Sequence, residues 1–291
     1  MATAVTTIQQ WLTQARDRVD SEDARYLAMH VLDLTPTGLF LNDGRELTPS
    51  ELDQLDALSA RRMAGEPIAY LIGTRGFWSL DLQVNAATLI PRADTETLVA
   101  AALELLEPYQ SPRVLDLGTG SGAIALAIAS ECPQAAVTAT DRSVEALEIA
   151  FANATALGLQ NVEFRNGSWF AALPEHSISF DVIVSNPPYI RSDDPHLEQG
   201  DLRFEPITAL ASGPDGLDDL RQIIAGATAY LNDGGWLLVE HGYDQGEAVR
   251  TLFAQSNYTE IETRRDFGDN DRITLGQASG PTIKASPLPT E

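Results

Sequence analysis

The chain has 291 residues, of which 44% are hydrophobic and 21% charged, a composition that is ordinary for a globular protein of one or two domains. Its formal net charge is −23 and its 19 basic residues include a single lysine, Lys284, so few groups are available to neutralise the phosphates of a nucleic acid. No segment approaches the roughly 18 consecutive apolar residues of a membrane span, and the N-terminus lacks the pattern of a secretory signal.

The first 75 residues predict a small helical bundle. Apolar residues recur at helical spacing between Val5 and Ala15, and again between Ala24 and Leu32. A third helix begins at Thr48-Pro49-Ser50-Glu51, which is a capping box with proline at the first helical position, and it ends near Gly65. Nothing here has the residue types of a catalytic site, so we expect a separate helical domain at 1–75.

Residues 76–280 predict an α/β domain. Residues 76–84 alternate like a strand or hairpin, and beyond them short apolar strands alternate with helices. The expected strands are 114–117, 136–140, 162–165, 180–185, 235–240, 258–263 and 272–275, and the expected helices include 94–107, 123–130, 143–157 and 217–231. This order is typical of a doubly wound, Rossmann-like, mostly parallel sheet, here of seven strands. The proline-rich residues 281–291 lack periodicity and predict a disordered tail.

A glycine-rich loop, DLGTGSG at residues 116–122, lies between the first of these strands and its helix. Glycines let the backbone turn tightly and pass close to a ligand, where a Cβ would obstruct it. Asp141 follows about 20 residues beyond the loop, where an acid at a strand end can accept hydrogen bonds from two ribose hydroxyls. Loop and acid together indicate a cofactor that contains a nucleoside.

The spacing of this loop bears on which cofactor it is. The dinucleotide fingerprint is G-x-G-x-x-G, and Ala123 at its last position keeps NAD formally possible. Asp116 would sit badly beside a pyrophosphate, but it suits the cationic amino group of a methionine moiety, directly or through water. The order D-x-G-x-G-x-G resembles the first motif of the class I methyltransferases, which implies S-adenosylmethionine as cofactor and S-adenosylhomocysteine as product.

The most specific feature is Asn186-Pro187-Pro188-Tyr189, directly after the strand 180–185. An amide nitrogen is a poor nucleophile because its lone pair is delocalised into the carbonyl, so a methylating site must hold the NH₂ group with acceptors. The side-chain oxygen of Asn186 and the carbonyl of Pro187 can each accept one N–H, and adjacent prolines stiffen the backbone. Tyr189 offers an aromatic face to a planar group.

The Asn-Pro-Pro-Tyr motif resembles that of methyltransferases that act on adenine N6, cytosine N4 and the glutamine amide. The whole chain is similar to the glutamine branch, the release-factor glutamine N5-methyltransferases of the PrmC/HemK type. The matching segments, apart from the helical N-terminal region, are GEPIAYLIGTRGFW (65–78), LIPRADTETLV (89–99), VLDLGTGSGAIALAIA (114–129), NPPYI (186–190), FEPITALASGPDGL (204–217) and RRDFGDNDRITLG (264–276).

This resemblance implies a substrate, the glutamine of the Gly-Gly-Gln tripeptide in class-1 peptide chain release factors, and a role for residues 1–75 in recognising that protein. By matching positions, Asn186 to Tyr189 bind the amide and Trp169 flanks the adenine. The residues expected to hold the cofactor are Gly118, Thr119, Gly120, Ser121, Gly122, Asp141, Trp169 and Asn186.

The chain departs from the family pattern at two places. Ser168 stands where many relatives have an acid, and Ala93 and Asp94 replace the usual Pro and Glu. Arg92 and Glu96 remain, and the sequence leaves open whether they contact ligand or only support the pocket.

Three rival functions stay open at this stage. An adenine-N6 nucleic-acid methyltransferase also suits the motif, but the net charge of −23 disfavours it. The others are a non-catalytic cofactor-binding module and a nicotinamide dehydrogenase. No His or Cys spacing predicts a metal, and Cys132, the sole cysteine, excludes an internal disulfide and fits a reducing compartment. We therefore expect a monomeric cytoplasmic enzyme that binds neither membrane nor nucleic acid directly.

Overall fold

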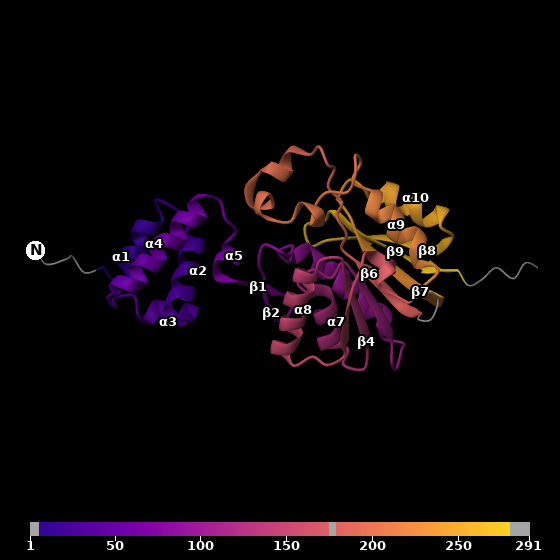
Figure 1. The fold of residues 1–291 in the computed structure, drawn as a ribbon, viewed down its shortest axis with the longest axis horizontal. Helices are drawn as coiled ribbons and strands as arrows, with labels where there is room; N and C mark the ends of the chain where they lie inside the picture. The colour runs from indigo at the N-terminus through magenta and orange to yellow at the C-terminus, as the bar shows by residue number, and fades with distance from the viewer. Residues whose placement is uncertain (1–5, 175–178, 280–291) are drawn as a thin grey trace, which may run out of the picture.

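The computed structural model describes residues 6–174 and 179–279. A helical bundle stands beside a larger body built on a seven-stranded sheet (Figure 1). The tail predicted at 281–291 lies outside the described residues. Within them, no helix combines the length and the apolar character that crossing a bilayer requires.

The helical bundle contains two helices more than the sequence predicted. Its elements are α1 (Ile8–Ala15), α2 (Ser21–Leu32), α3 (Pro36–Leu41), α4 (Pro49–Met63) and α5 (Ile68–Ile72). The predicted capping box at Thr48 is present, with Thr48 and Glu51 each bonding the other's backbone N–H. Buried Ile8, Leu27 and Leu55 form the centre of its core. The sequence missed α3 and α5 because six and five residues are too few to show a helical period.

A hairpin connects the bundle to the sheet. Its strands β1 (Thr74–Phe77) and β2 (Leu80–Gln83) pair antiparallel, and Trp78 between them has a left-handed backbone with φ 56°. Asn153 accepts a hydrogen bond from the backbone N of Gln83 at 2.7 Å and donates one to its carbonyl at 3.0 Å. Since Asn153 lies on a helix that covers the sheet, this pair of bonds docks the hairpin on the larger domain.

The sheet has the order β5-β4-β3-β6-β7-β9-β8, with β9 antiparallel to both neighbours and the other pairs parallel. Its strands are β3 (Arg113–Leu117), β4 (Ala136–Asp141), β5 (Val162–Asn166), β6 (Phe180–Ser185), β7 (Leu231–Glu240), β8 (Tyr258–Arg265) and β9 (Asp271–Ala278). The helices of this domain are α6 (Glu96–Leu106), α7 (Ala123–Glu131), α8 (Val144–Leu157), α9 (Asp218–Ala227) and α10 (Gly246–Gln255). This confirms the predicted mostly parallel, doubly wound sheet of seven strands.

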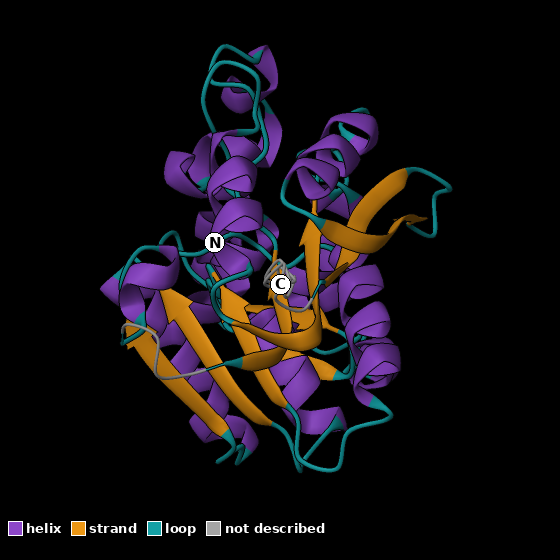
Figure 2. Ribbon diagram, turned by 90° about the vertical axis from the view of Figure 1, so that its right-hand side faces the viewer, coloured by secondary structure: helices purple, strands orange, loops and turns teal. Residues whose placement is uncertain are grey.

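Helices cover both faces of the sheet (Figure 2). On β3, Val114 joins the core under α6 and α7, whereas the next residue, Leu115, joins the core under α9 and α10. This alternation follows from the two-residue period of a strand, and it explains why the strands read as continuous apolar runs. From β3 the chain first adds β4 and β5 on one side of the sheet, and then β6 and β7 on the other side of β3. The strand order therefore reverses between β3 and β6, and ligands bind at this point in such folds.

Two predicted boundaries, the end of a helix and the start of the next strand, are wrong. The helix expected at 217–231 ends at Ala227, and β7 begins at Leu231 rather than at residue 235. The segment Asn232–Gly235 looks like a turn in the sequence, yet Leu231 pairs with Phe180 and an irregularity in register follows. The irregular register leaves room in β7 for extra residues, so residues typical of turns can lie inside this strand.

The bundle is tied to the loop between β6 and α9. Arg62 of α4 bonds Asp23 at 2.6 Å and Asp201 of that loop at 3.2 Å. Arg203 donates to the carbonyl of Ala64 at 2.6 Å, and a Cβ added at Gly65, whose φ is +95°, would come within 1.7 Å of its guanidinium. Gly65 is therefore required both for its backbone conformation and for space.

Gly65→Ala is accordingly expected to destabilise the protein by more than Gly158→Ala. Both glycines have a positive φ, which costs a residue with a Cβ about 1–2 kcal/mol, but a Cβ at Gly158 meets no described atom within 4 Å. Loss of the Arg203 bond should add about 1 kcal/mol at Gly65. Urea denaturation of both variants measures the difference, and equal losses would show that Arg203 contributes nothing to this joint.

Candidate active site

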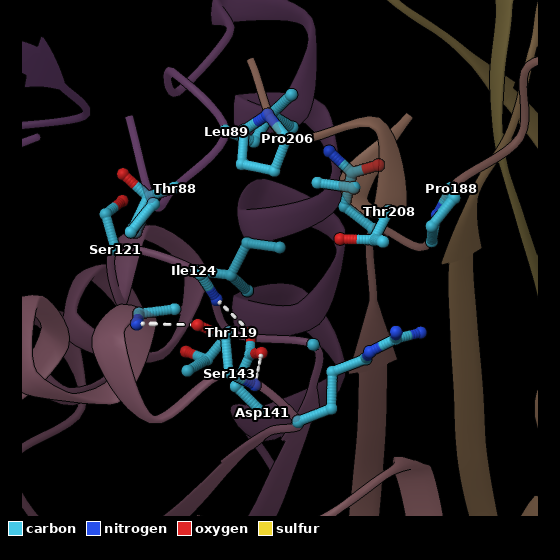
Figure 3. A pocket seen from close by; sticks show the side chains of 18 of the residues that line it. Thr88, Leu89, Thr119, Ser121, Ile124, Asp141, Ser143, Pro188, Pro206 and Thr208 are labelled. Carbon is cyan, nitrogen blue, oxygen red and sulfur yellow. Dashed lines mark hydrogen bonds between the residues drawn. The ribbon is translucent and has the colours of Figure 1, made fainter. Parts of the chain in front are cut away.

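A cavity of about 310 Å³ opens at the carboxyl edge of the sheet, next to the point where its order reverses. Segments that follow four neighbouring strands line it: the loop after β3, the end of β4, the turn after β5 and the motif after β6. Asp141 and Ser143 lie well apart from Pro188 and Thr208 across it (Figure 3). Its volume lies within the range for small-molecule sites.

The glycine loop forms one wall of this cavity. Gly118 and Gly120 have φ values of 75° and 55°, in the left-handed region that favours glycine. A Cβ at Gly118 would come within 3.0 Å of the Trp169 ring, whereas one at Gly120 would have no described atom within 4 Å. Backbone N–H groups of Gly118 and Thr119 both bond the carbonyl of Thr140, at 2.8 and 2.9 Å. The loop is thus held rigidly to β4, with its backbone against the cavity.

Asp116 lies behind the loop instead of in the cavity lining. Its Oδ2 accepts hydrogen bonds from the Thr119 hydroxyl at 2.7 Å and from the backbone N of Ala125 at 3.2 Å. Oδ1 is buried and has no hydrogen-bond partner among the described residues. Burial raises the pKa of Asp116 to about 7. A direct or water-mediated contact of Asp116 with a cationic group was predicted. The structure contains the unsatisfied acceptor for it, on the carboxyl group that accepts from the lining residue Thr119.

Asp116→Asn is expected to change how stability depends on pH. Because burial raises the pKa of Asp116 from 3.8 to about 7, the folded chain keeps a proton that the unfolded chain releases. The free energy of unfolding of the wild type should therefore fall, relative to that of the variant, as the pH rises from about 4 to about 7. Urea denaturation at a series of pH values measures this difference, and parallel curves would contradict it.

Asp141 organises the loop while it lines the cavity. Its Oδ2 accepts from the backbone N of Gly120 at 2.9 Å, and its Oδ1 accepts from the backbone N of Ser143 at 2.8 Å. Each carboxylate oxygen keeps a further lone pair, because an ionised carboxylate offers about four acceptor positions. Asp141 can therefore accept bonds from a ligand's vicinal hydroxyls without giving up its hold on the loop.

Trp169 lines the cavity next to Gly118 of the glycine loop. Its backbone φ is 49°, unusual for a bulky residue, and its Nε1 donates to Asp219 Oδ1 at 3.2 Å. The other oxygen of Asp219 accepts from the Ser212 hydroxyl at 2.7 Å. Asp219 also lines the cavity, beside Ser168. An acid is thus present here although Ser168 replaces the usual one, and the sequence missed it because it comes 50 residues later along the chain.

Only two of the four residues of the Asn-Pro-Pro-Tyr motif line the cavity. Asn186 and Pro188 line the cavity, whereas Pro187 and Tyr189 do not. Tyr189 packs in the core under α9 and α10, and its hydroxyl donates to Glu240 Oε1 at 3.2 Å. Asn186 Nδ2 donates to the Thr95 hydroxyl at 3.1 Å. The expected stacking face of Tyr189 is therefore not presented to the cavity, where Pro188 lies instead.

The question that the sequence left open about Arg92 and Glu96 has an answer. Arg92 lines the cavity and pairs with buried Glu205, which also accepts from the backbone N of Ile90 at 3.0 Å. Burial raises the pKa of Glu205, against the lowering effect of the Arg92 charge. Glu96 accepts from the backbone N of Trp78 at 2.8 Å and supports the hairpin. Asp94, at one departure from the family pattern, pairs with Arg272 at 3.3 Å.

The loop after Glu205 closes the cavity, and the sequence had not predicted contacts there. Pro206, Thr208 and Ala209 line it, and Figure 3 labels Pro206 and Thr208 among the lining side chains. No group of three or more His, Cys, Asp or Glu side chains suited to a metal occurs in the part of the chain that the structure describes. The cavity is thus lined at one end by a glycine loop with an acid and at the other by an asparagine that precedes two prolines.

Comparison with known proteins agrees with this arrangement. Residues 110–271 match the family model described as a methyltransferase domain, and residues 3–73 match the model described as the PrmC N-terminal domain. A solved methyltransferase from Pyrococcus furiosus has a TM-score of 0.52 at 18% identity, covering 77% of this chain and 100% of that one, a likeness that concerns the fold alone.

Relatives of known type are more similar in sequence. The chain is 54% identical over 269 residues to the release factor glutamine methyltransferase of Xylella fastidiosa (strain 9a5c), covering 92% of this chain and 97% of that one. It is 48% identical over 274 residues to the release factor glutamine methyltransferase of Escherichia coli (strain K12), with 92% and 98% covered. Such identity over nearly the whole of both chains confirms the resemblance: the protein belongs to the release factor glutamine methyltransferase family.

Proposed function

We propose that this enzyme transfers a methyl group from S-adenosylmethionine to the N5 amide nitrogen of the glutamine in the Gly-Gly-Gln motif of class-1 peptide chain release factors. The observation that carries the proposal is one cavity with Asn186 at one end and the glycine loop with Asp141 at the other. The names of the relatives at 54% and 48% identity supply the substrate.

The residues around the loop fit this cofactor. Gly120 leaves open space where a Cβ would project, and the buried Oδ1 of Asp116 is an acceptor without a partner among the described residues. Asp141 would accept from the ribose hydroxyls, Trp169 would lie against the adenine, and Thr119 would lie nearest the methionine end. When bound, the cofactor supplies an electrophilic methyl group on a sulfonium that leaves readily.

The chain's own task is to position the amide. Asn186 Oδ1 would accept one N–H of the glutamine amide. The carbonyl of Pro187, which is bonded directly to the lining residue Pro188, would accept the other, so that the nitrogen lone pair faces the methyl group. Two acceptors on the same NH₂ group also polarise its N–H bonds and raise the electron density on the nitrogen. No general base is needed, because a methylated amide nitrogen is strongly acidic and can release its proton to water.

The helical domain at 1–75 would bind the release factor beyond its glutamine. It is joined through Arg62 and Arg203 to the loop that continues into Pro206 and Thr208 at the cavity. A protein bound on the bundle could therefore reach the cavity over a continuous surface. We propose that the enzyme acts as a monomer.

Transfer of labelled methyl from S-adenosylmethionine tests the proposal. Purified release factor, its variant with alanine in place of the Gly-Gly-Gln glutamine, and duplex DNA are offered in parallel. We expect label on the wild-type release factor alone. Label on DNA would favour the adenine-N6 rival, and equal label on both release factors would exclude that glutamine as acceptor.

A further inference from the structure

Three large apolar side chains are exposed on the loops at the carboxyl edge of the sheet, where the cavity opens. They are Ile207, Tyr243 and Phe267, with exposed fractions of 55%, 69% and 86%. Phe267 is the most exposed large apolar residue in the part of the chain that the structure describes. A single exposed apolar residue is ordinary on a protein surface, but three around one opening call for a partner. We call these three side chains the apolar rim.

Phe267 lies in the turn between β8 and β9, which a buried acid makes rigid. Because β9 runs antiparallel to β7, and the last residue of β7 pairs with Ile273 near the start of β9, this turn lies at the carboxyl edge. Asp266 Oδ1 accepts from the backbone N of Gly268 at 2.8 Å and from that of Asn270 at 3.0 Å. The aromatic ring is therefore carried on an ordered backbone, which lowers the entropy cost of binding through it.

Arg272 ties this turn to the cavity. Its guanidinium pairs with Asp266 at 2.9 Å and with Asp94 at 3.3 Å, and its side chain is only 12% exposed. Asp94 lies between Arg92 and Thr95, which both line the cavity. The turn is thus fixed beside the opening by two ion pairs that share one largely buried arginine.

Ile207 and Tyr243 belong to segments with similar attachments. Ile207 lies between two lining residues in the loop after β6. The turn that carries Tyr243 follows β7, and Gln245 in this turn donates from its side chain to the carbonyl of Tyr189 at 3.0 Å. Each residue of the apolar rim therefore lies in a segment that contacts the cavity lining or the Asn-Pro-Pro-Tyr motif, or belongs to that lining.

We propose that the apolar rim is the surface on which the catalytic domain docks the release factor, with Phe267 as its main anchor. The partner would contribute an apolar patch next to its Gly-Gly-Gln segment. The cavity, at about 310 Å³, has the size of a small-molecule site, so a folded substrate can insert a side chain while its body stays outside, against the opening. Aromatic side chains are enriched in protein interfaces and often dominate their binding energy. The inference rests on the proposed function and adds a second contact to that of the helical domain.

Phe267→Ala tests this in the full-length enzyme. The side chain is mostly in solvent, so the free energy of unfolding should stay at the wild-type value. We expect KM for the release factor to rise roughly 10- to 100-fold, with kcat and the Kd for S-adenosylmethionine unchanged, as for loss of an interface anchor. Phe267→Trp, which keeps an aromatic ring, should retain most of the affinity, and Tyr243→Ala should raise KM in the same direction.

Phe151→Ala is the matched control. Phe151 is also an exposed phenylalanine, at 63%, but it lies in the middle of α8 and not on a loop at the carboxyl edge. It should keep the wild-type KM. If Phe267→Ala raises KM no more than Phe151→Ala, or if it lowers kcat or the cofactor affinity instead, the docking role is overturned.

Binding without turnover gives an independent readout. The release factor with alanine in place of the Gly-Gly-Gln glutamine is titrated into enzyme loaded with S-adenosylhomocysteine, and its Kd should rise in Phe267→Ala in parallel with KM. Light scattering should give the same mass for the wild type and the variant. A wild-type dimer that dissociates in Phe267→Ala would assign the apolar rim to a second copy of the chain and overturn the proposal.

The two levels of the account fail in different ways. If the wild type methylates no release factor, the proposed function is refuted. If the wild type methylates the release factor and Phe267→Ala keeps both the wild-type KM and the wild-type Kd, the docking inference alone is refuted.

Discussion

Asn186→Ala is expected to lower kcat toward the release factor on the order of 10²- to 10³-fold, with only a modest loss of affinity for S-adenosylmethionine. The variant loses the side-chain oxygen that would accept from the glutamine NH₂, and an amide nitrogen held by one acceptor alone is no longer fixed in line with the methyl group. The glycine loop is held by Thr140 and Asp141, not by Asn186, so the cofactor end of the cavity should survive.

Steady-state kinetics together with calorimetric titration of the cofactor separates these effects. Asn232→Ala serves as control, because Asn232 bonds Asp181 at 2.7 Å near the opposite edge of the sheet. It should retain kcat. An Asn186→Ala enzyme with near-normal kcat would show that Asn186 does not hold the substrate amide.

Asp141→Ala is expected to weaken binding of S-adenosylmethionine on the order of 10²-fold or more. Two hydroxyl bonds to a carboxylate would be lost, each worth about 1.5–3 kcal/mol. The backbone N–H groups of Gly120 and Ser143 would also lose their acceptor, so the loop would no longer be preorganised. Calorimetric titration of the cofactor into the purified variant measures the change.

Asp181→Ala provides the comparison for this variant. Asp181 also accepts from a backbone N–H, that of Arg113 at 2.8 Å, and from a side chain, but at the far edge of the sheet. The two variants should lose comparable stability, while only Asp141→Ala should lose cofactor affinity. Equal affinities would mean that Asp141 supports the loop without binding the ribose.

Much of the fold could be predicted from the sequence because its signals are local. The capping box at Thr48, the apolar strand 114–117 and the glycine loop each depend on neighbouring residues, and the structure contains all three. The start of β7 could not be predicted in this way. Residues 232–235 have turn composition, and they lie inside β7 because the residues on either side of them, Leu231 and Trp236, pair with β6.

The site shows the same division between local and distant signals. Asn186 and Asp141 follow strands whose carboxyl ends must meet, so their approach to one cavity could be expected. Asp219 against Trp169, and Glu240 against Tyr189, are separated by about fifty residues, and no spacing rule connects them. Tyr189 could not be oriented from the sequence, because its direction depends on a buried carboxyl that belongs to another strand.

Localisation of the transferred methyl group tests the central claim most directly. Release factor treated with the enzyme and S-adenosylmethionine is digested, and fragmentation of the peptide that contains Gly-Gly-Gln locates the label. We predict one added methyl group on the side-chain amide nitrogen of that glutamine. A methyl group on another residue, or on the backbone of this tripeptide, would contradict the account of an amide nitrogen held by Asn186.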